Sequence, residues 1–306
     1  MAESLDAFLE RGRVLVDAAL ERWLPTARTS PPLVAEAMRY SVFAGGKRLR
    51  PMLTLAAAEA IDRSAAGLAL PAACAIEMIH TYSLIHDDLP AMDNDTLRRG
   101  RPTLHVVYGE GIAILAGDGL HAEAFTLLAE SPSTDTSEIR ERRVRVSRLI
   151  GQAAGPAGMV GGQTIDLQAA GQVPGHAMTL DADGLQAMHA RKTGALIRAS
   201  AVSGAIMAGA NDAAVDAIDR YATDLGLAFQ IVDDVLDVEG SAEQLGKSAG
   251  KDASADKPTY PSLFGLERSR ALAAECVDRA LTAIASVGLT NGQLGAIATW
   301  VVSRRN

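Results

Sequence analysis

The chain contains little cysteine, few aromatic residues and no excess of positive charge. Of its 306 residues, 2 are cysteine and 4% are aromatic, and the net charge at pH 7 is -8. Cys74 and Cys276 lie far apart in apolar stretches and form no pair of metal ligands, which is typical of buried thiols in a reducing cytoplasm. The acidic balance argues against a nucleic-acid partner, because phosphate backbones select basic surfaces.

Long uninterrupted apolar segments are also missing. The longest ones are broken by Gly, Asp or Glu well before the roughly 18 residues that a membrane span needs, so we expect no such span. The first residues, MAESLDAFLERGRVLVDAAL, form an amphipathic repeat with acidic side chains and contain no apolar signal core. We therefore expect a soluble, cytoplasmic protein.

Helical periodicity runs through nearly the whole sequence. Hydrophobic residues make up 48% of it, Ala and Leu supply most of them, and no alternating strand pattern of useful length occurs. No loop shifts the composition enough to mark a boundary, so we expect one all-α domain over residues 1–306. The expected helices cover 4–23, 32–44, 51–62, 70–88, 109–129, 137–153, 182–208, 212–239, 257–264, 267–287 and 291–303.

Two acidic clusters follow strongly apolar helices. The first is HDDLPAMDND, at 86–95, and the second is QIVDDVLD, at 230–237. Asp233 and Asp237 are four residues apart and share a helix face. In the first cluster, Pro90 should interrupt the helix and let Asp93 curl back toward Asp87. Carboxylates that converge at an apolar helix bundle need cations between them, and hard oxygen ligands suit Mg²⁺ completed by substrate phosphates. A solvated acidic helix end would explain one such cluster, but two in one chain favour a metal site.

Basic residues occur close to both clusters. Lys47 and Arg50, in the segment GGKRLRP, come just before an expected helix and can face an anion beside its N-terminus. Each basic group alone is explained by solvent-facing charge, but their placement around the carboxylates predicts a site for metal-bridged polyanions. The other groups are Arg98, Arg99, Arg101, Lys192, Lys247, Lys251 and Lys257.

These segments resemble one family across almost the whole chain. The motifs GGKRLRP, YSLIHDDLPAMDNDTLRRGRPT, GGQTIDL, RKTGALI, QIVDDVLDV and GKSAGKDASADKPTYPSL occur in the order found in trans-prenyltransferases, and they look most like those of bacterial farnesyl diphosphate synthases. The resemblance implies the isoprenoid synthase fold, with antiparallel helices around a deep apolar cavity, usually as a homodimer. It also implies a reaction in which isopentenyl diphosphate is joined head to tail to dimethylallyl or geranyl diphosphate, giving farnesyl diphosphate and releasing diphosphate.

The resemblance further implies roles for individual residues. About three Mg²⁺ ions, bridged by the allylic diphosphate, would be held by Asp87, Asp88, Asp93, Asp233 and Asp237. The remaining oxygens of that diphosphate would be bound by Arg98, Lys192, Lys247 and Lys257. Isopentenyl diphosphate, which takes no metal, would be bound by Gly46, Lys47, Arg50, His80 and Arg99. The developing carbocation would be bordered by Gln163, Thr193 and Gln230, and His80 lies two helical turns before Asp87 on the same face.

Product length is expected to depend on Tyr82 and Ser83. In the matching family the cavity floor lies beneath the first acidic motif, and Tyr82 precedes Asp87 by five residues, or roughly 7.5 Å along a helix. A ring at that position would stop a tail longer than farnesyl, although Tyr82 as ordinary core packing is an open alternative. Geranyl and geranylgeranyl products also stay open.

Three other readings remain open for the whole chain. His80, His86 and Asp87 with a later Asp form a loose pattern of an HD-type metal phosphohydrolase, which leaves the second acidic cluster unexplained. A non-catalytic partner subunit would be expected to lose carboxylates from one cluster, and a terpene cyclase would have no use for the isopentenyl-binding set. The C-terminal Arg304 and Arg305 either cover the diphosphates or are ordinary solvated charge.

Overall fold

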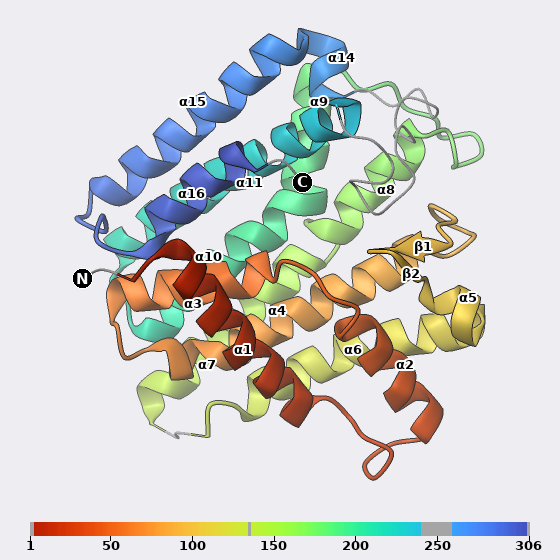
Figure 1. Cartoon of the computed structure of the whole chain (residues 1–306), viewed down its shortest axis with the longest axis horizontal. Coiled ribbons are helices and arrows are strands. Elements are labelled where there is room, and N and C mark those ends of the chain that lie inside the picture. Colours follow the sequence, from red (N-terminus) through yellow and green to blue (C-terminus); the bar gives the residue numbers. More distant parts are fainter. Residues whose placement is uncertain (1–2, 134–135, 240–258, 305–306) are drawn as a thin grey trace.

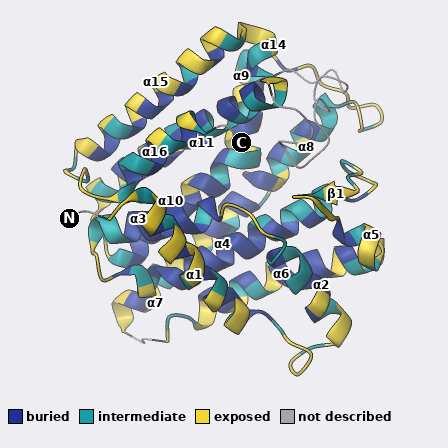
Figure 2. Cartoon of the chain, in the orientation of Figure 1, coloured by how far each residue is buried: buried dark blue, intermediate teal, exposed yellow. Residues whose placement is uncertain are grey.

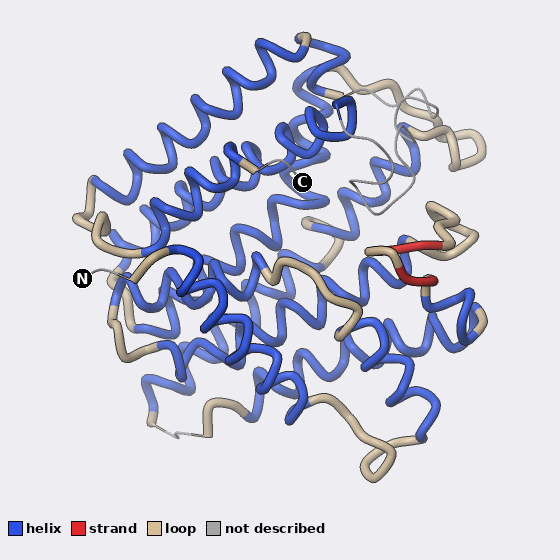
Figure 3. Tube along the Cα trace, viewed as in Figure 1, coloured by secondary structure: helices blue, strands red, loops and turns tan. Residues whose placement is uncertain are grey.

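The computed structural model describes residues 3–133, 136–239 and 259–304, which form a bundle of helices (Figure 1). The only strands in these ranges are two short ones that pair as an antiparallel hairpin (Figure 3). The all-α prediction is therefore confirmed. The elements are α1 Leu5–Trp23, α2 Pro32–Val42, α3 Leu49–Ile61, α4 Ala66–Asp87, β1 Leu97–Arg98, β2 Arg101–Pro102, α5 Leu104–Tyr108, α6 Glu110–Glu130, α7 Ser137–Ala154, α8 Met159–Ala169, α9 Ala182–His189, the π-helix η1 Ala190–Gly194, α10 Ala195–Ala208, α11 Asp212–Glu239, α14 Tyr260–Phe264, α15 Leu266–Ala285 and α16 Gln293–Ser303.

Helices α3, α4 and α10 form the centre of the bundle, and they are buried along most of their length (Figure 2). Their many Ala and Gly residues let the backbones approach closely. A Cβ atom added to Gly204 of α10 would lie 2.0 Å from the carbonyl oxygen of Thr54 in α3. The outer helices α1, α7 and α15 are amphipathic instead and bury one face each.

The largest error in the predicted helices concerns the GGQTIDL segment, which lies in α8 and not in a loop. Its glycines lower helix propensity, but they serve packing. An added Cβ atom on Gly161 would lie 2.0 Å from the carbonyl oxygen of Pro156, and one on Gly162 would lie 2.2 Å from the backbone nitrogen of Lys192. The helix expected over 182–208 is also interrupted, because the backbone widens to a π-helix at η1. Of the helix expected over 257–264, the structure describes α14, while residues 257 and 258 lie outside the described ranges.

Two helices, α4 and α6, are long and apolar enough to cross a membrane by length and composition, which differs from the expectation of none. Each helix contains a charged residue, Glu77 in α4 and Asp118 in α6, so neither is an unbroken apolar run of the kind that a membrane span was expected to need. The α4 window is 78% buried, as in the central helix of a water-soluble bundle, and the α6 window is 39% buried. Passing this test is weak support for a membrane span, because core helices of soluble proteins pass it as well.

Candidate active site

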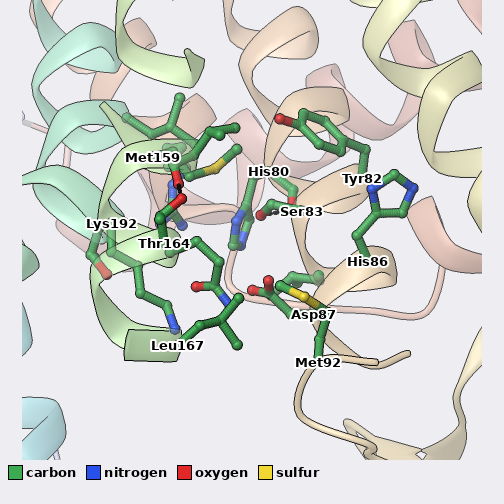
Figure 4. Close-up of a pocket in the computed structure, with 16 residues that line it drawn as sticks. His80, Tyr82, Ser83, His86, Asp87, Met92, Met159, Thr164, Leu167 and Lys192 are labelled. Atoms are coloured by element: carbon green, nitrogen blue, oxygen red, sulfur yellow. Dashed lines mark hydrogen bonds between the residues drawn. The ribbon is translucent and has the colours of Figure 1, made fainter. Parts of the chain in front are cut away.

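One cavity of about 300 Å³ brings together residues from α3, α4, α8, η1 and α10 (Figure 4). It is lined on one side by α4 and on the other by α8 and η1, so motifs more than 100 residues apart meet here. His80 and Asp87 both line it, as their shared helix face predicted. The residues predicted for the site that line the cavity are Arg50, His80, Tyr82, Ser83, Asp87, Gln163, Lys192 and Thr193.

The first acidic cluster curls at the end of α4 as predicted. The helix ends at Asp87, Pro90 follows, and the backbone N–H of Asp93 donates to the carbonyl oxygen of Asp87 at 2.8 Å. Asn94 has a positive φ of 51°, which completes the reversal. Asp93 and Asp87 therefore lie close enough for their charges to interact, and the turn gathers carboxylates where a straight helix would separate them.

Burial makes the ionised forms of the carboxylates in this turn less favourable. Burial raises the pKa of Asp87 to about 6, and neighbouring Asp93 adds to the rise while Lys192 opposes it. Burial also raises the pKa of Asp88, against the opposing effect of Arg98, which binds the Asp88 carboxylate through Nε and Nη2 at 2.6–2.9 Å. Further cations beside these groups would favour their ionised forms.

Lys192 reaches the cavity from the π-helix and forms an ion pair with Asp166 at 2.5 Å. The wider turn of η1 presents consecutive residues, Lys192 and Thr193, to the same cavity. Burial alone would lower the pKa of Lys192, but Asp166 and Asp87 more than offset this and raise it. Lys192 is therefore an ammonium group at neutral pH, opposite Asp87.

A second, cationic region lies beside the carboxylates. Arg50 lines the cavity, and burial lowers its pKa to about 10, so it is charged at neutral pH. Burial and the nearby arginines lower the pKa of His80 well below its ordinary value, so this imidazole is neutral. Arg99 donates to the carbonyl oxygen of Gly45, next to Gly46 and Lys47. A diphosphate can be bound here by positive charge without a metal ion.

Arg98 and Arg99 line a smaller cavity of about 30 Å³ together with Asp88. Leu84 lines both cavities, so the two arginines lie beside the main cavity, but they do not line it.

The second acidic cluster lies on α11. Arg304, after α16, forms an ion pair with Asp233 at 2.7 Å and stacks on Phe229, and its side chain is only 4% exposed. Asp237 follows one turn after Asp233 and is partly buried. Arg304 is therefore not an ordinary solvated charge, whereas Arg305 lies outside the described residues. Lys47 is close to this cluster, since the charges of Asp233 and Arg304 both act on its pKa.

Gln230 and Asp234 have a different environment. The Gln230 side-chain amide donates to Asp234 at 3.1 Å, and the N–H of Tyr260 donates to the same carboxylate at 3.0 Å. Asp234 is 5% exposed and joins α11 to α14, so it is a structural group in this arrangement. Gln230 does not line the main cavity.

The carboxylates fit Mg²⁺ that is shared with a substrate. Within the described ranges, no three His, Cys, Asp or Glu side chains are close enough to hold a metal ion by themselves. Mg²⁺ commonly binds one or two protein carboxylates and completes its octahedron with water and phosphate oxygens. Asp87 is partly buried and the Asp233 side chain is 41% exposed, so a Mg²⁺ ion brought in with a diphosphate could reach either carboxylate.

Several site residues were missed by the sequence reasoning. Asp166, the partner of Lys192, belongs to GGQTIDL and could have been found from that motif. Met159, Val160 and Leu167 form an apolar wall opposite α4, and nothing in their local sequence marks them once α8 is read as a loop. Lys247 and Lys257, which were predicted to bind diphosphate, lie outside the described residues.

Known proteins with this arrangement are prenyl synthases. The polyprenyl synthetase family matches residues 31–287. The chain is 44% identical over 303 residues to a geranylgeranyl diphosphate synthase of Cyanophora paradoxa, covering 99% of this chain and 97% of that one. It is 43% identical over 302 residues to a farnesyl diphosphate synthase of Geobacillus stearothermophilus, covering 98% of each. A crystal structure of an FPP/GFPP synthase from Zymomonas mobilis superposes with a TM-score of 0.84 at 37% identity, over 97% of this chain and 98% of that one. The chain therefore belongs to the polyprenyl synthetase family and is a prenyltransferase with the all-α isoprenoid synthase fold.

Proposed function

We propose that this chain joins isopentenyl diphosphate head to tail to dimethylallyl and geranyl diphosphate, with Mg²⁺, and releases diphosphate and farnesyl diphosphate. The observation that carries the proposal is one largely apolar cavity that is lined by Asp87 and Lys192 and also by Arg50 and neutral His80. Two differently charged regions around one cavity suit two diphosphates that must be bound differently.

In this proposal the allylic diphosphate lies between the two acidic clusters. Asp87, Asp88 and Asp93, with Asp233 and Asp237, would hold the Mg²⁺ ions, which would supply positive charge to stabilise the departing diphosphate. Lys192 and Arg98 bind its remaining oxygens, and Lys247 and Lys257 are proposed to do the same. Lys192 is suited to this because it is an ammonium group that lines the cavity.

Isopentenyl diphosphate is bound by Gly46, Lys47, Arg50, His80 and Arg99 in this proposal. Its double bond attacks the allylic carbon as the C–O bond breaks, and a proton is then lost to the departed diphosphate. Met159, Val160 and Leu167 keep water away from the carbocation. The buried Gln163 amide has no hydrogen-bond partner among the described residues, so its carbonyl dipole is available to the cation, as is the Thr193 hydroxyl, which also lines the cavity.

We propose that Tyr82 limits the product to farnesyl length, with Ser83 beside it. The Tyr82 ring lines the cavity, stacks on His121 of α6 at 4.8 Å between centroids, and meets His86 edge-on at 5.7 Å. A ring held between α4 and α6 in this way cannot swing aside easily. A geranylgeranyl product is the second candidate, because relatives of nearly equal identity carry either name.

The phosphohydrolase reading loses its support here. His86 lies beside Tyr82, and its Nε2 donates a hydrogen bond to the carbonyl oxygen of Ile114 (Figure 4). His80 instead lies close to several arginines, whose charges act on its pKa. The two histidines therefore do not form one metal site with Asp87.

We also propose that the chain acts as a cytoplasmic homodimer. Exposed apolar side chains lie on α5 and on one face of α6, namely Val106 (51%), Val107 (46%), Ile114 (42%) and Leu115 (56%). A face of this kind would be buried by a second copy of the chain. Light scattering should give twice the chain mass, and Leu115→Glu should reduce it; a monomeric wild-type protein contradicts the proposal.

The experiment that tests the function is a reaction of purified protein with labelled isopentenyl diphosphate and each allylic primer, with and without Mg²⁺. We expect a Mg²⁺-dependent product of farnesyl length. A longer or shorter product removes the argument from Tyr82 and keeps the prenyltransferase. Folded protein that condenses no primer overturns the proposed function.

A further inference from the structure

We propose that Arg48 and Glu77 are positioning residues, which hold the GGKRLRP loop against α4 so that Lys47 and Arg50 face the same diphosphate as His80. This inference rests on the proposed function, because it concerns the site assigned there to isopentenyl diphosphate. Neither residue lines the cavity. Both act through the groups that do.

Arg48 has an unusual backbone in the middle of the loop. Gly45, Gly46 and Arg48 have φ values of 90°, 126° and 51°, and the left-handed region is unfavourable for a residue with a side chain. This turn lets α3 begin at Leu49, directly after Arg48. The conformation therefore decides where Lys47 and Arg50, on either side of the turn, point.

The Arg48 side chain turns inward and joins three other helices to this turn. Its Nη1 donates to Glu77 of α4 at 2.8 Å, its Nε to Asp17 of α1 at 3.0 Å, and its Nη2 to the carbonyl oxygen of Val42 in α2 at 2.7 Å. The side chains of Arg48 and Glu77 are each 3% exposed. A planar guanidinium can satisfy three acceptors in fixed directions, which a lysine cannot do.

Glu77 connects this network to the diphosphate site. It lies one helical turn before His80 on α4, so the loop is fixed to the helix that carries both His80 and Asp87. The negative charge of Glu77 acts on Arg50 and Arg99 as well as on Arg48, so it also balances the cationic region before substrate arrives. On the other side of the turn, an added Cβ on Gly46 would lie 2.4 Å from the Arg99 guanidinium.

The main test is Arg48→Lys, which keeps the positive charge but removes the planar guanidinium that donates to three acceptors. We expect the KM for isopentenyl diphosphate to rise about tenfold, while the KM for the allylic diphosphate stays within about twofold, because misplacing a binding group by about 1 Å is costly. Arg11→Lys is the matched control. Arg11 also joins α1 to α3, through Glu59 at 2.9 Å, but lies away from the site, so both KM values should stay unchanged.

A double variant separates positioning from stability. Removing one member of a buried ion pair leaves an unpaired charge, whereas Arg48→Met combined with Glu77→Leu removes both charges and should fold. We expect its thermal stability to be close to that of the wild type and its KM for isopentenyl diphosphate to remain raised. Recovery of that KM together with the stability overturns the inference, as does an equal rise in both KM values for Arg48→Lys.

Binding of inorganic pyrophosphate in EDTA, measured by calorimetry, repeats the test without turnover. Arg48→Lys and the double variant should bind pyrophosphate about tenfold more weakly than the wild type and Arg11→Lys do. In both variants the misplaced loop loses a charge-assisted contact from Lys47 or Arg50 to phosphate. Unchanged binding overturns the inference. If the wild-type enzyme makes no prenyl product but the variants still bind pyrophosphate weakly, the proposed function fails and the positioning role stands.

Discussion

Replacing Gly162 with Ala should move Lys192, the proposed diphosphate-binding lysine, and lower both activity and stability. Gly162 lies in α8 where that helix touches η1, and an added Cβ would lie 2.2 Å from the backbone nitrogen of Lys192 and 2.6 Å from its Cα. Real Cβ atoms essentially never come within 3.0 Å of such atoms, so α8 and η1 would have to separate by 0.8 Å or more, the difference between 3.0 Å and 2.2 Å. A side-chain rotation cannot relieve this contact, because the obstructing atoms belong to the backbone.

The net change in stability follows from two opposing effects. Overpacking a core costs about 1–3 kcal/mol, and the gain in helix propensity from Gly to Ala is about 1 kcal/mol, so we expect a net loss of up to about 2 kcal/mol. Displacing Lys192 by about 1 Å should lower kcat by about 100-fold. The assays are urea unfolding and steady-state condensation of isopentenyl diphosphate with geranyl diphosphate.

Gly67→Ala is the control for this substitution. Gly67, like Gly162, lies in a helix, but it is exposed and nothing lies within 4 Å of an added Cβ. This variant should therefore gain up to about 1 kcal/mol of stability and keep its activity. A Gly162→Ala protein that is as stable and as active as the wild type would refute the reasoning.

Four further outcomes are expected. Tyr82→Ala should lengthen the product to geranylgeranyl or beyond by chromatography, and an unchanged C15 product would show that the ring is only core packing. Asp87→Asn should abolish Mg²⁺-dependent activity yet raise the free energy of unfolding in EDTA at pH 8 by up to about 3 kcal/mol, because the pKa of Asp87 rises from 3.8 to about 6 on folding. Stability is lost as pH rises from about 4 to about 6, so the gain from Asn should disappear toward pH 4, and a gain that does not vary with pH contradicts this cause. Arg304→Met should lower the Mg²⁺ concentration for half-maximal activity severalfold, because the guanidinium bound to Asp233 no longer competes with the ion; a higher requirement would contradict competition. Neither Cys74 nor Cys276 should react with Ellman's reagent before unfolding, because both are buried and burial raises the pKa of both thiols; rapid labelling of native protein would disprove it.

The parts of the site that could be predicted from sequence are those with strong local signals. Pro90 after an apolar helix predicted the turn that returns Asp93 to Asp87, and the structure confirms that hydrogen bond. The seven-residue spacing of His80 and Asp87 likewise placed both on one wall of the cavity. Each prediction needed only helix geometry and one residue type with a fixed conformational effect.

The parts that could not be predicted depend on contacts between distant segments. Local propensity reads the glycines of GGQTIDL as a loop, but Gly161 and Gly162 lie in α8, where Gly162 packs against the backbone of Lys192 in η1. The π-helix at Lys192 has no local marker, because its widened turn depends on the neighbouring helices. Helix α11 packs closely on η1 as well, since a Cβ atom added to Gly226 of α11 would lie 3.1 Å from the Cα of Gly194. Tertiary packing determined the backbone at both positions.

The ion pairs around the cavity divide by exposure into permanent and exchangeable ones. Arg98 and Lys192, which pair with Asp88 and Asp166, have side chains 28% and 27% exposed, so an incoming diphosphate can reach them. The pair of Arg48 and Glu77 is 3% exposed on both sides and cannot be reached without opening the bundle. A buried pair gains little net stability over apolar packing, because the desolvation penalty offsets the attraction. The presence of this pair beside the proposed diphosphate site is therefore better explained by the direction it imposes on Lys47 and Arg50 than by stability.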